Sequence, residues 1–176
     1  MINIIKKMIL AVMTAALVFA AFPVTSAFAQ GENPAPMGEV SNEKLEKAWA
    51  RQLNIYERLG NGFDGLDAQI AKFQERIDKA ASKGKNVTAL QSALDAFEAA
   101  SKTAQPIYDS IESIVNAHAG FDADGKVTDA EQAKSTLQEV GAKLKEVKSS
   151  MDGTGKALRE AFKAFREANK PPKSDS

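Results

Sequence analysis

The sequence predicts an all-α protein, an elongated antiparallel bundle of three long helices with heptad seams. Its apolar residues recur at alternating steps of three and four, which is typical of helices packed side by side as in a coiled coil. Only residues 83–86 and 119–127 interrupt this period within the central part of the chain. Because the period keeps its phase between the interruptions, we expect helices near residues 41–83, 87–118 and 128–168.

The amino-terminal 29 residues have the pattern of a secretory signal peptide. Lys6 and Lys7 precede an uncharged apolar run of 15 residues, 8–22, which is shorter than the roughly 20 residues that span a membrane. The small residues of Ala27-Phe28-Ala29 then form a cleavage site. We expect cleavage near Ala29 and a secreted or periplasmic location; the alternative is an uncleaved anchor.

The chain after cleavage has the length of one ordinary domain. It contains 147 of the 176 residues, and loss of two of the 23 basic and none of the 23 acidic residues leaves a charge of about −2. This balance argues against a nucleic-acid partner, and the absence of cysteine excludes disulfides, thiol chemistry and lipid attachment at a lipobox thiol. We expect a flexible leader at 30–40, a helical bundle domain at 41–169, a disordered tail at 170–176, and no stable membrane anchor.

The first helix has one competing interpretation, a four-helix bundle in which the chain breaks at residues 60–65. Gly60, Gly62 and Gly65 would each cost about 1 kcal/mol inside a helix. Nine large apolar residues of the seam could each gain roughly 1.5 to 3 kcal/mol on burial. The seam comprises Leu45, Trp49, Gln52, Tyr56, Leu59, Phe63, Leu66, Ile70, Phe73, Ile77 and Ala80. Its unbroken phase favours one continuous helix.

The second and third helices are predicted from seams of the same kind. The second comprises Val87, Leu90, Leu94, Phe97, Ser101, Ala104, Tyr108, Ile111, Val115 and His118. The third comprises Ala130, Ala133, Leu137, Val140, Leu144, Val147, Met151, Thr154, Leu158, Ala161 and Phe165. The tight turn at 83–86 makes the first two helices antiparallel.

The expected register aligns several unusual residues across the bundle. It places Gly62 and Gly65 beside Pro106, and Pro106 beside Gly141, which predicts a narrow or bent waist because an interior proline kinks a helix. This waist is either simple helix accommodation or a notch for a small ligand. The same register puts His118 level with Gln52, which we interpret as polar residues fixing the register.

Because the middle helix is the shortest, the ends of its neighbours should extend past it. Leu45 and Trp49 would overhang one end of the bundle, and Phe162 and Phe165 the other. Loops, a folded-back segment or another molecule must cover such apolar ends. This is the sequence argument for a partner, either an unknown protein or a second copy of the chain.

Residues 120–131 contain Asp122, Asp124, Gly125 and Glu131 between two predicted helices. With this spacing the segment resembles the calcium loop of the EF-hand family. If Gly125 is the sixth-position glycine, the resemblance implies that Asp122 and Asp124 occupy ligand positions three and five, the Lys126 carbonyl position seven and Glu131 the bidentate twelfth position. The match covers this loop and its flanking helices, and there is no second loop.

The loop departs from the EF-hand pattern at its first position, where Gly120 replaces the usual aspartate. Loss of that ligand predicts calcium binding in the roughly millimolar range or weaker. A purely structural interpretation explains most of the same residues: Gly120 suits a left-handed position that ends a helix, and residues 128–131 form a capping box in which Glu131 bonds back to the Thr128 amide.

The residues needed for common kinds of catalysis are missing. With one histidine and no cysteine, neither a classical zinc site nor a catalytic triad can be assembled, so we do not expect an enzyme. A basic stripe near the carboxyl end is interpreted as a solvated face, since Glu160 and Glu167 interrupt it. It consists of Lys156, Arg159, Lys163, Arg166 and Lys170. The sequence predicts an exported, non-catalytic protein with a binding or structural role; the alternative is a weak calcium-binding module.

Overall fold

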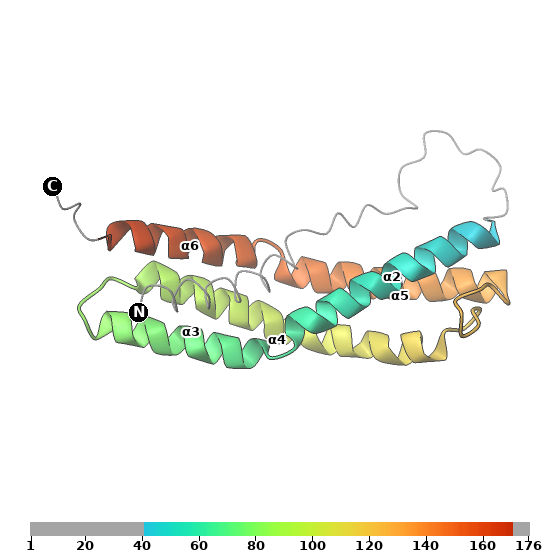
Figure 1. The fold of residues 1–176 in the computed structure, drawn as a ribbon, viewed down its shortest axis with the longest axis horizontal. Helices are drawn as coiled ribbons and strands as arrows, with labels where there is room; N and C mark the ends of the chain where they lie inside the picture. Colours follow the sequence, from blue (N-terminus) through green and yellow to red (C-terminus); the bar gives the residue numbers. More distant parts are fainter. Residues whose placement is uncertain (1–40, 171–176) are drawn as a thin grey trace, which may run out of the picture.

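The computed structural model describes residues 41–170, which form the predicted all-α bundle. The helices within this part of the chain are α2 (Asn42–Phe63), α3 (Leu66–Ala81), α4 (Thr88–Ala117), α5 (Ala130–Met151) and α6 (Thr154–Ala168). They make three segments packed against each other, two of which are bent (Figure 1). The signal peptide, the leader and residues 171–176 of the tail lie outside the described residues.

The first segment bends between α2 and α3, within the interval where a break was considered. Asp64 is extended and Gly65 is left-handed, with φ 68°, so the prediction of one continuous helix is wrong at these two residues. The Asp64 amide still donates to the Gly60 carbonyl at 2.8 Å. Buried Phe63 and Leu66 continue the same apolar seam on either side, which explains why the sequence pattern shows no slip.

The third segment bends at Asp152 and Gly153, where no break was predicted. Gly153 has φ 73° and separates α5 from α6. Met151 and Leu158 remain buried on the two sides of the bend. The apolar pattern of the sequence therefore gives no sign of this bend. The central segment, α4, runs without a break for 30 residues through Pro106.

The two bends divide the bundle into two unequal halves that share α4 (Figure 1). In one half, α2, α5 and the carboxyl-terminal part of α4 all pack on one another. In the other half, α3 and α6 pack mainly on the amino-terminal part of α4, and neither is a principal packing partner of the other. A tilted contact between the Phe73 and Phe162 rings, 6.0 Å apart, connects α3 with α6.

The predicted register holds for the first connection. Gln74 of α3 and Gln91 of α4 exchange two hydrogen bonds of 2.7 Å. Further along, the Phe63 and Tyr108 rings lie 5.2 Å apart. The second contact places the bend of the first segment near Pro106, where the sequence predicted a bent waist.

The register across the second connection is shifted from the prediction by about two helical turns. The Thr136 hydroxyl donates to the Ala119 carbonyl at 2.8 Å, and Lys143 donates to the Ser110 hydroxyl at 2.9 Å. Gly141 therefore does not lie beside Pro106. It faces Gln52, whose side-chain nitrogen would be 3.0 Å from a Cβ at that glycine.

Gln52 and His118 were predicted to lie level, but the structure gives them separate partners. Gln52 Nε2 donates to the Leu137 carbonyl at 2.9 Å. His118 ends α4 in a left-handed conformation, φ 34°, with its Nδ1 2.8 Å from the Asn116 carbonyl. Gln52 therefore joins α2 to α5, whereas His118 belongs to the loop that follows α4.

Candidate functional site

The loop between α4 and α5 is a compact hairpin rather than an open connection. Phe121 and Val127 form an antiparallel bridge, and the Asp122 amide donates to the Lys126 carbonyl at 2.8 Å. The Asp122 carboxylate accepts the amides of Asp124 and Lys126 at 2.9 and 2.8 Å. These bonds fold the loop back on itself, which accounts for the register shift across this connection.

Gly120 anchors the hairpin to the beginning of α5. Its φ of +85° confirms the left-handed position expected from the sequence. A Cβ at this residue would also lie 2.7 Å from the Asp129 carbonyl oxygen and 2.7 Å from the Ala133 Cα, both backbone atoms. Only glycine fits here, so the missing aspartate of the EF-hand pattern is a packing requirement of this loop.

The hairpin covers the end of α2. The Phe121 ring stacks on the Trp49 indole, with centroids 4.8 Å apart and planes 10° apart, and both side chains are buried. Leu45 is buried as well. The predicted overhang at this end is therefore covered by the chain's own loop, and it no longer argues for a partner.

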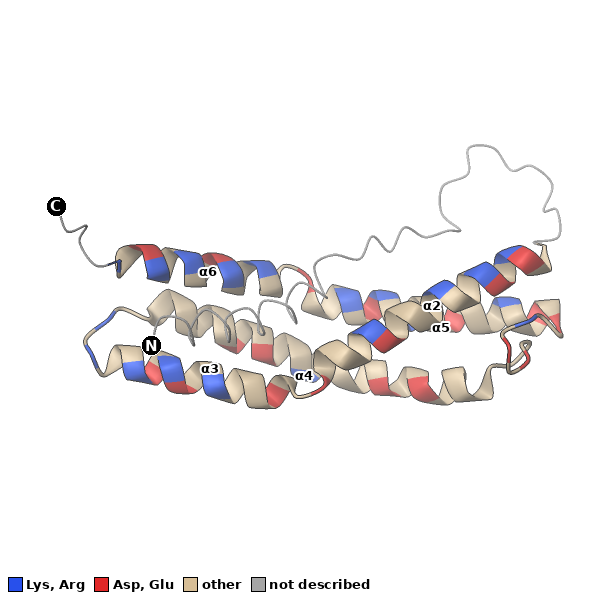
Figure 2. Ribbon diagram, viewed as in Figure 1, with Lys and Arg blue, Asp and Glu red and all other residues tan. Residues whose placement is uncertain are grey.

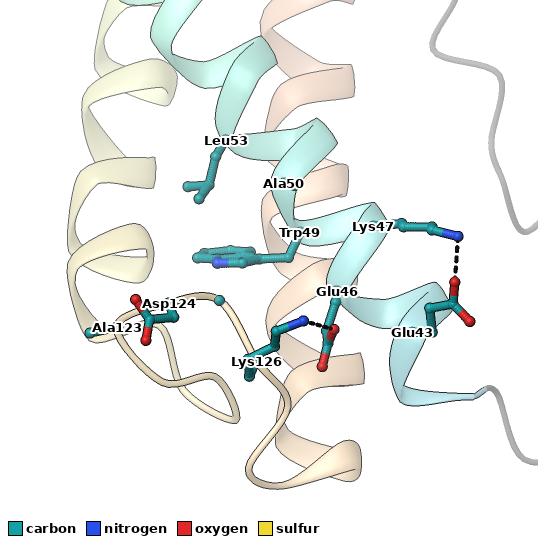
Figure 3. Close-up of a pocket in the computed structure, with 10 residues that line it drawn as sticks. Glu43, Glu46, Lys47, Trp49, Ala50, Leu53, Ala123, Asp124 and Lys126 are labelled. Atoms are coloured by element: carbon teal, nitrogen blue, oxygen red, sulfur yellow. Dashed lines mark hydrogen bonds and ion pairs between the residues drawn. The ribbon is translucent and has the colours of Figure 1, made fainter.

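The hairpin is also joined to α2 by a carboxylate that bonds to two of its residues. Glu46 accepts from the Lys126 ammonium at 2.8 Å and from the Val127 amide at 3.2 Å (Figure 3). These bonds lower the pKa of the Glu46 carboxyl, with the Lys126 bond contributing most. The same carboxylate raises the pKa of Lys126. Both groups are held in their charged forms at neutral pH.

A groove of about 520 Å³ lies between α2 and the hairpin (Figure 3). Its lining consists of Glu43, Glu46, Lys47, Trp49, Ala50, Leu53, Ala123, Asp124, Gly125 and Lys126. Two pairs of lining charges neutralise each other, since Lys47 also bonds Glu43 at 2.6 Å. Among the described residues, the Asp124 carboxylate forms no salt bridge, although it lies close enough to Lys126 to help raise the pKa of that residue, so the lining carries one more negative than positive charge.

The four residues predicted as calcium ligands do not converge in this structure. Asp122 and the Lys126 carbonyl are bonded to backbone amides within the hairpin. Glu131 lies on α5, where its exposed carboxylate pairs with Lys134 at 3.0 Å. Within residues 41–170, no three histidine, cysteine or acidic side chains are placed to hold a metal ion together.

The helix cap that follows the loop differs from the predicted capping box. Asp129, and not Thr128, is the N-cap residue of α5, and its carboxylate accepts the Glu131 and Gln132 amides at 3.0 Å. The Thr128 amide donates to the Gly120 carbonyl at 2.9 Å. The aspartate therefore satisfies the first amides of α5, and the exposed Glu131 carboxylate pairs with Lys134 instead of bonding back to the Thr128 amide.

Sequence reasoning did not identify Glu46 or the groove. Eighty positions separate Glu46 from Lys126, and neither residue belongs to an apolar seam. The useful signal was the predicted overhang, which placed Trp49 beyond the end of α4, where this hairpin lies.

Four residues of the basic stripe are exposed, as the solvated-face interpretation predicts: Lys156, Lys163, Arg166 and Lys170. The fifth, Arg159, is half-buried. Figure 2 shows acidic residues interspersed with the basic ones along α6, and Lys156 lies 3.9 Å from Glu160. None of the helices in the described part of the chain is both long and apolar enough to cross a membrane. Comparison with protein families, curated proteins and solved structures gives no match to this chain.

Proposed function

We propose that this chain is an exported helical-bundle protein that acts by binding and not by catalysis. The signal-peptide pattern of residues 1–29 supports export. The bundle supplies a rigid scaffold, and the groove between α2 and the hairpin is the proposed binding site.

The observation that carries this proposal is the preformed groove whose lining has one carboxylate in excess of its ammonium groups. Asp124 lies at its edge, and the apolar side chains of Ala50 and Leu53 line it together with the Trp49 indole. This combination complements a ligand that has a cationic group beside an aliphatic one, such as an arginine or lysine next to a leucine in an extended peptide.

The electrostatics of the groove favour binding over proton-transfer catalysis. A general acid or base works best with a pKa near the ambient pH. The Glu46–Lys126 pair instead moves the pKa of the acid down and that of the base up. Each group is stabilised in its charged form, which suits an ion pair that holds the hairpin against α2.

The binding proposal can be tested with N-acetyl-leucyl-arginine amide as the probe. Trp49 is the only tryptophan in the sequence and lines the groove, so its fluorescence reports occupancy directly. We expect a saturable change at millimolar probe, which Asp124→Asn should weaken several-fold. Asp67→Asn removes the same charge on α3 and should leave binding unchanged. No saturable response, or equal weakening by both variants, would contradict the groove as the binding site.

The export part is tested separately by mass spectrometry of the secreted product. We expect a mature amino terminus at Gln30, after cleavage at Ala29. Retention of the full chain in the cell or membrane fraction would count against export and would leave the binding result unaffected.

A second candidate function is weak calcium binding by the hairpin. The unpaired Asp124 carboxylate favours it, together with Asp122 two residues away. Binding would require the Lys126 carbonyl to leave its bond with the Asp122 amide. Trp49 lies beside Gly125, where a Cβ would be 3.2 Å from the indole, so calcium should alter its fluorescence in the unmodified protein and not in Asp124→Ala. A flat titration at several millimolar calcium would rule this function out.

A further inference from the structure

The chain contains two tyrosines, and the fold stacks them on each other. Tyr56 lies on α2 and Tyr108 on α4. Their ring centroids are 4.8 Å apart and the ring planes differ by 17°. Both residues are half-buried, so each keeps some contact with solvent. The fold therefore brings two phenols from distant parts of the sequence together at the surface of the bundle.

The hydroxyl groups of the two stacked rings are neighbours. Burial is the main cause that raises the pKa of the Tyr108 phenol, and an interaction with the Tyr56 hydroxyl raises it further. In a phenol, the ortho carbons are bonded directly to the carbon that carries the hydroxyl. Nearly parallel rings with neighbouring hydroxyls therefore also bring an ortho carbon of one ring close to an ortho carbon of the other.

The Tyr108 hydroxyl fits against α2 because residue 60 is a glycine. A Cβ at Gly60 would collide with the hydroxyl oxygen and lie 3.3 Å from the ring carbon that carries it. Glycine weakens a helix interior relative to alanine. A phenylalanine at position 108 would stack on Tyr56 without needing that space. Ring packing alone therefore does not explain the hydroxyl that this glycine accommodates, which points to the chemistry of the phenol.

From this geometry we propose that Tyr56 and Tyr108 form an oxidative cross-linking site, at which a dityrosine bond joins α2 to α4. The chain has no cysteine, so a disulfide cannot make such a link. In an exported protein the bond would act as disulfides do in other secreted domains, by restricting the unfolded chain. The proposal goes beyond the function proposed above and does not depend on the groove.

The reaction needs a one-electron oxidant, which we take to be a haem peroxidase supplied with hydrogen peroxide. Each phenol loses one electron and one proton and becomes a phenoxyl radical. The two radicals join through a carbon–carbon bond between ortho carbons, and the hydrogen on each of these carbons moves to the phenol oxygen of its own ring. In all, the chain loses two protons and two electrons, which convert one hydrogen peroxide into two water molecules. Electrons leave a half-buried ring without direct contact, so the oxidant needs no binding cavity.

The proposal is tested by treating the full mature chain, at low concentration, with a haem peroxidase and hydrogen peroxide. We expect the blue fluorescence of dityrosine in the monomer band of a denaturing gel, and an intact mass lower by two hydrogen atoms. After digestion with trypsin, mass spectrometry should find residues 52–58 joined to residues 103–126. Because the link closes the loop between the two tyrosines, the melting temperature should rise by about 10 °C.

Three variants separate the stacked pair from tyrosine oxidation in general. Tyr56→Phe and Tyr108→Phe should each abolish the fluorescence of the monomer and the rise in melting temperature. Tyr56→Phe combined with Glu57→Tyr is the matched control, because it keeps two tyrosines and moves one of them to the next, exposed position of α2. This double variant should form fluorescent covalent dimers without the internal cross-link.

A fluorescent monomer obtained with the peroxidase, or with the small photochemical oxidant formed from tris(bipyridine)ruthenium and persulfate, supports the proposal. If neither oxidant gives one, the pair is only a packing contact and the proposal is overturned. It is equally overturned if the fluorescence appears only in covalent dimers, or if the double variant cross-links internally as well as the unmodified chain does.

Discussion

At the scale of single residues, Gly120 shows how one backbone position can decide a loop. Gly120→Ala would place a methyl group against the backbone of Asp129 and Ala133 at a φ of +85°. Gly84→Ala is the matched control, because Gly84 also has a positive φ, 71°, but no atom lies within 4 Å of its Cβ position. We expect about 1 kcal/mol of destabilisation at Gly84 and at least about 3 kcal/mol at Gly120 in urea unfolding. Equal losses would show that φ alone matters.

The Glu46 carboxyl provides a prediction about pH. Its pKa is lowered in the folded protein, chiefly by the bond from Lys126. Its contribution to stability is therefore fully present above the unfolded value of 4.5 and is lost as the pH falls through the lower folded value. In an NMR titration of the Glu46 carboxyl carbon, Lys126→Met should move the pKa upward toward 4.5. An unchanged pKa would mean that Lys126 does not hold this carboxylate.

At the scale of helices, the apolar seams predicted which faces are buried but did not predict the bends. Asp64-Gly65 and Asp152-Gly153 each leave the helix for two residues, yet buried residues continue in phase on both sides. The spacing of a seam depends only on which residues are buried. It therefore does not change at a bend that leaves the same residues buried. The second register was also missed, because it depends on how the hairpin folds. The Asp-Gly pairs were the local signal, since this dipeptide favours turns.

Gly60 of α2 is a position where helix propensity and packing should oppose each other. Alanine normally favours a helix over glycine by about 1 kcal/mol, but a Cβ at Gly60 would collide with the phenolic oxygen of Tyr108. We expect Gly60→Ala to destabilise the protein by about 1 to 2 kcal/mol. In a Tyr108→Phe background, the loss should shrink by at least about 1 kcal/mol, as measured by a double-mutant cycle in urea. Additive effects would show that α2 and α4 are not in contact here.

At the scale of the whole molecule, the two halves differ in how completely their helices enclose one another. In the half with α2 and α5, which we call the closed half, α2, α4 and α5 each pack on the other two. The Gln52 bond to the Leu137 carbonyl and the hairpin link α2 further to the rest of this half. The half with α3 and α6 depends mainly on packing against α4. The groove belongs to the closed half.

This difference predicts that the two halves open at different free energies, because helices with fewer packing partners expose their amides more readily. In native-state hydrogen exchange followed by mass spectrometry, we expect α3 and α6 to exchange before α5 and the carboxyl-terminal part of α4. The amino-terminal part of α4 should be intermediate, since it loses its covering helices while its own helix persists. Val140→Ala, at a fully buried position of α5, should accelerate exchange mainly in the closed half. If all five helices instead exchange together, the bends are no boundary and the bundle unfolds as one cooperative unit.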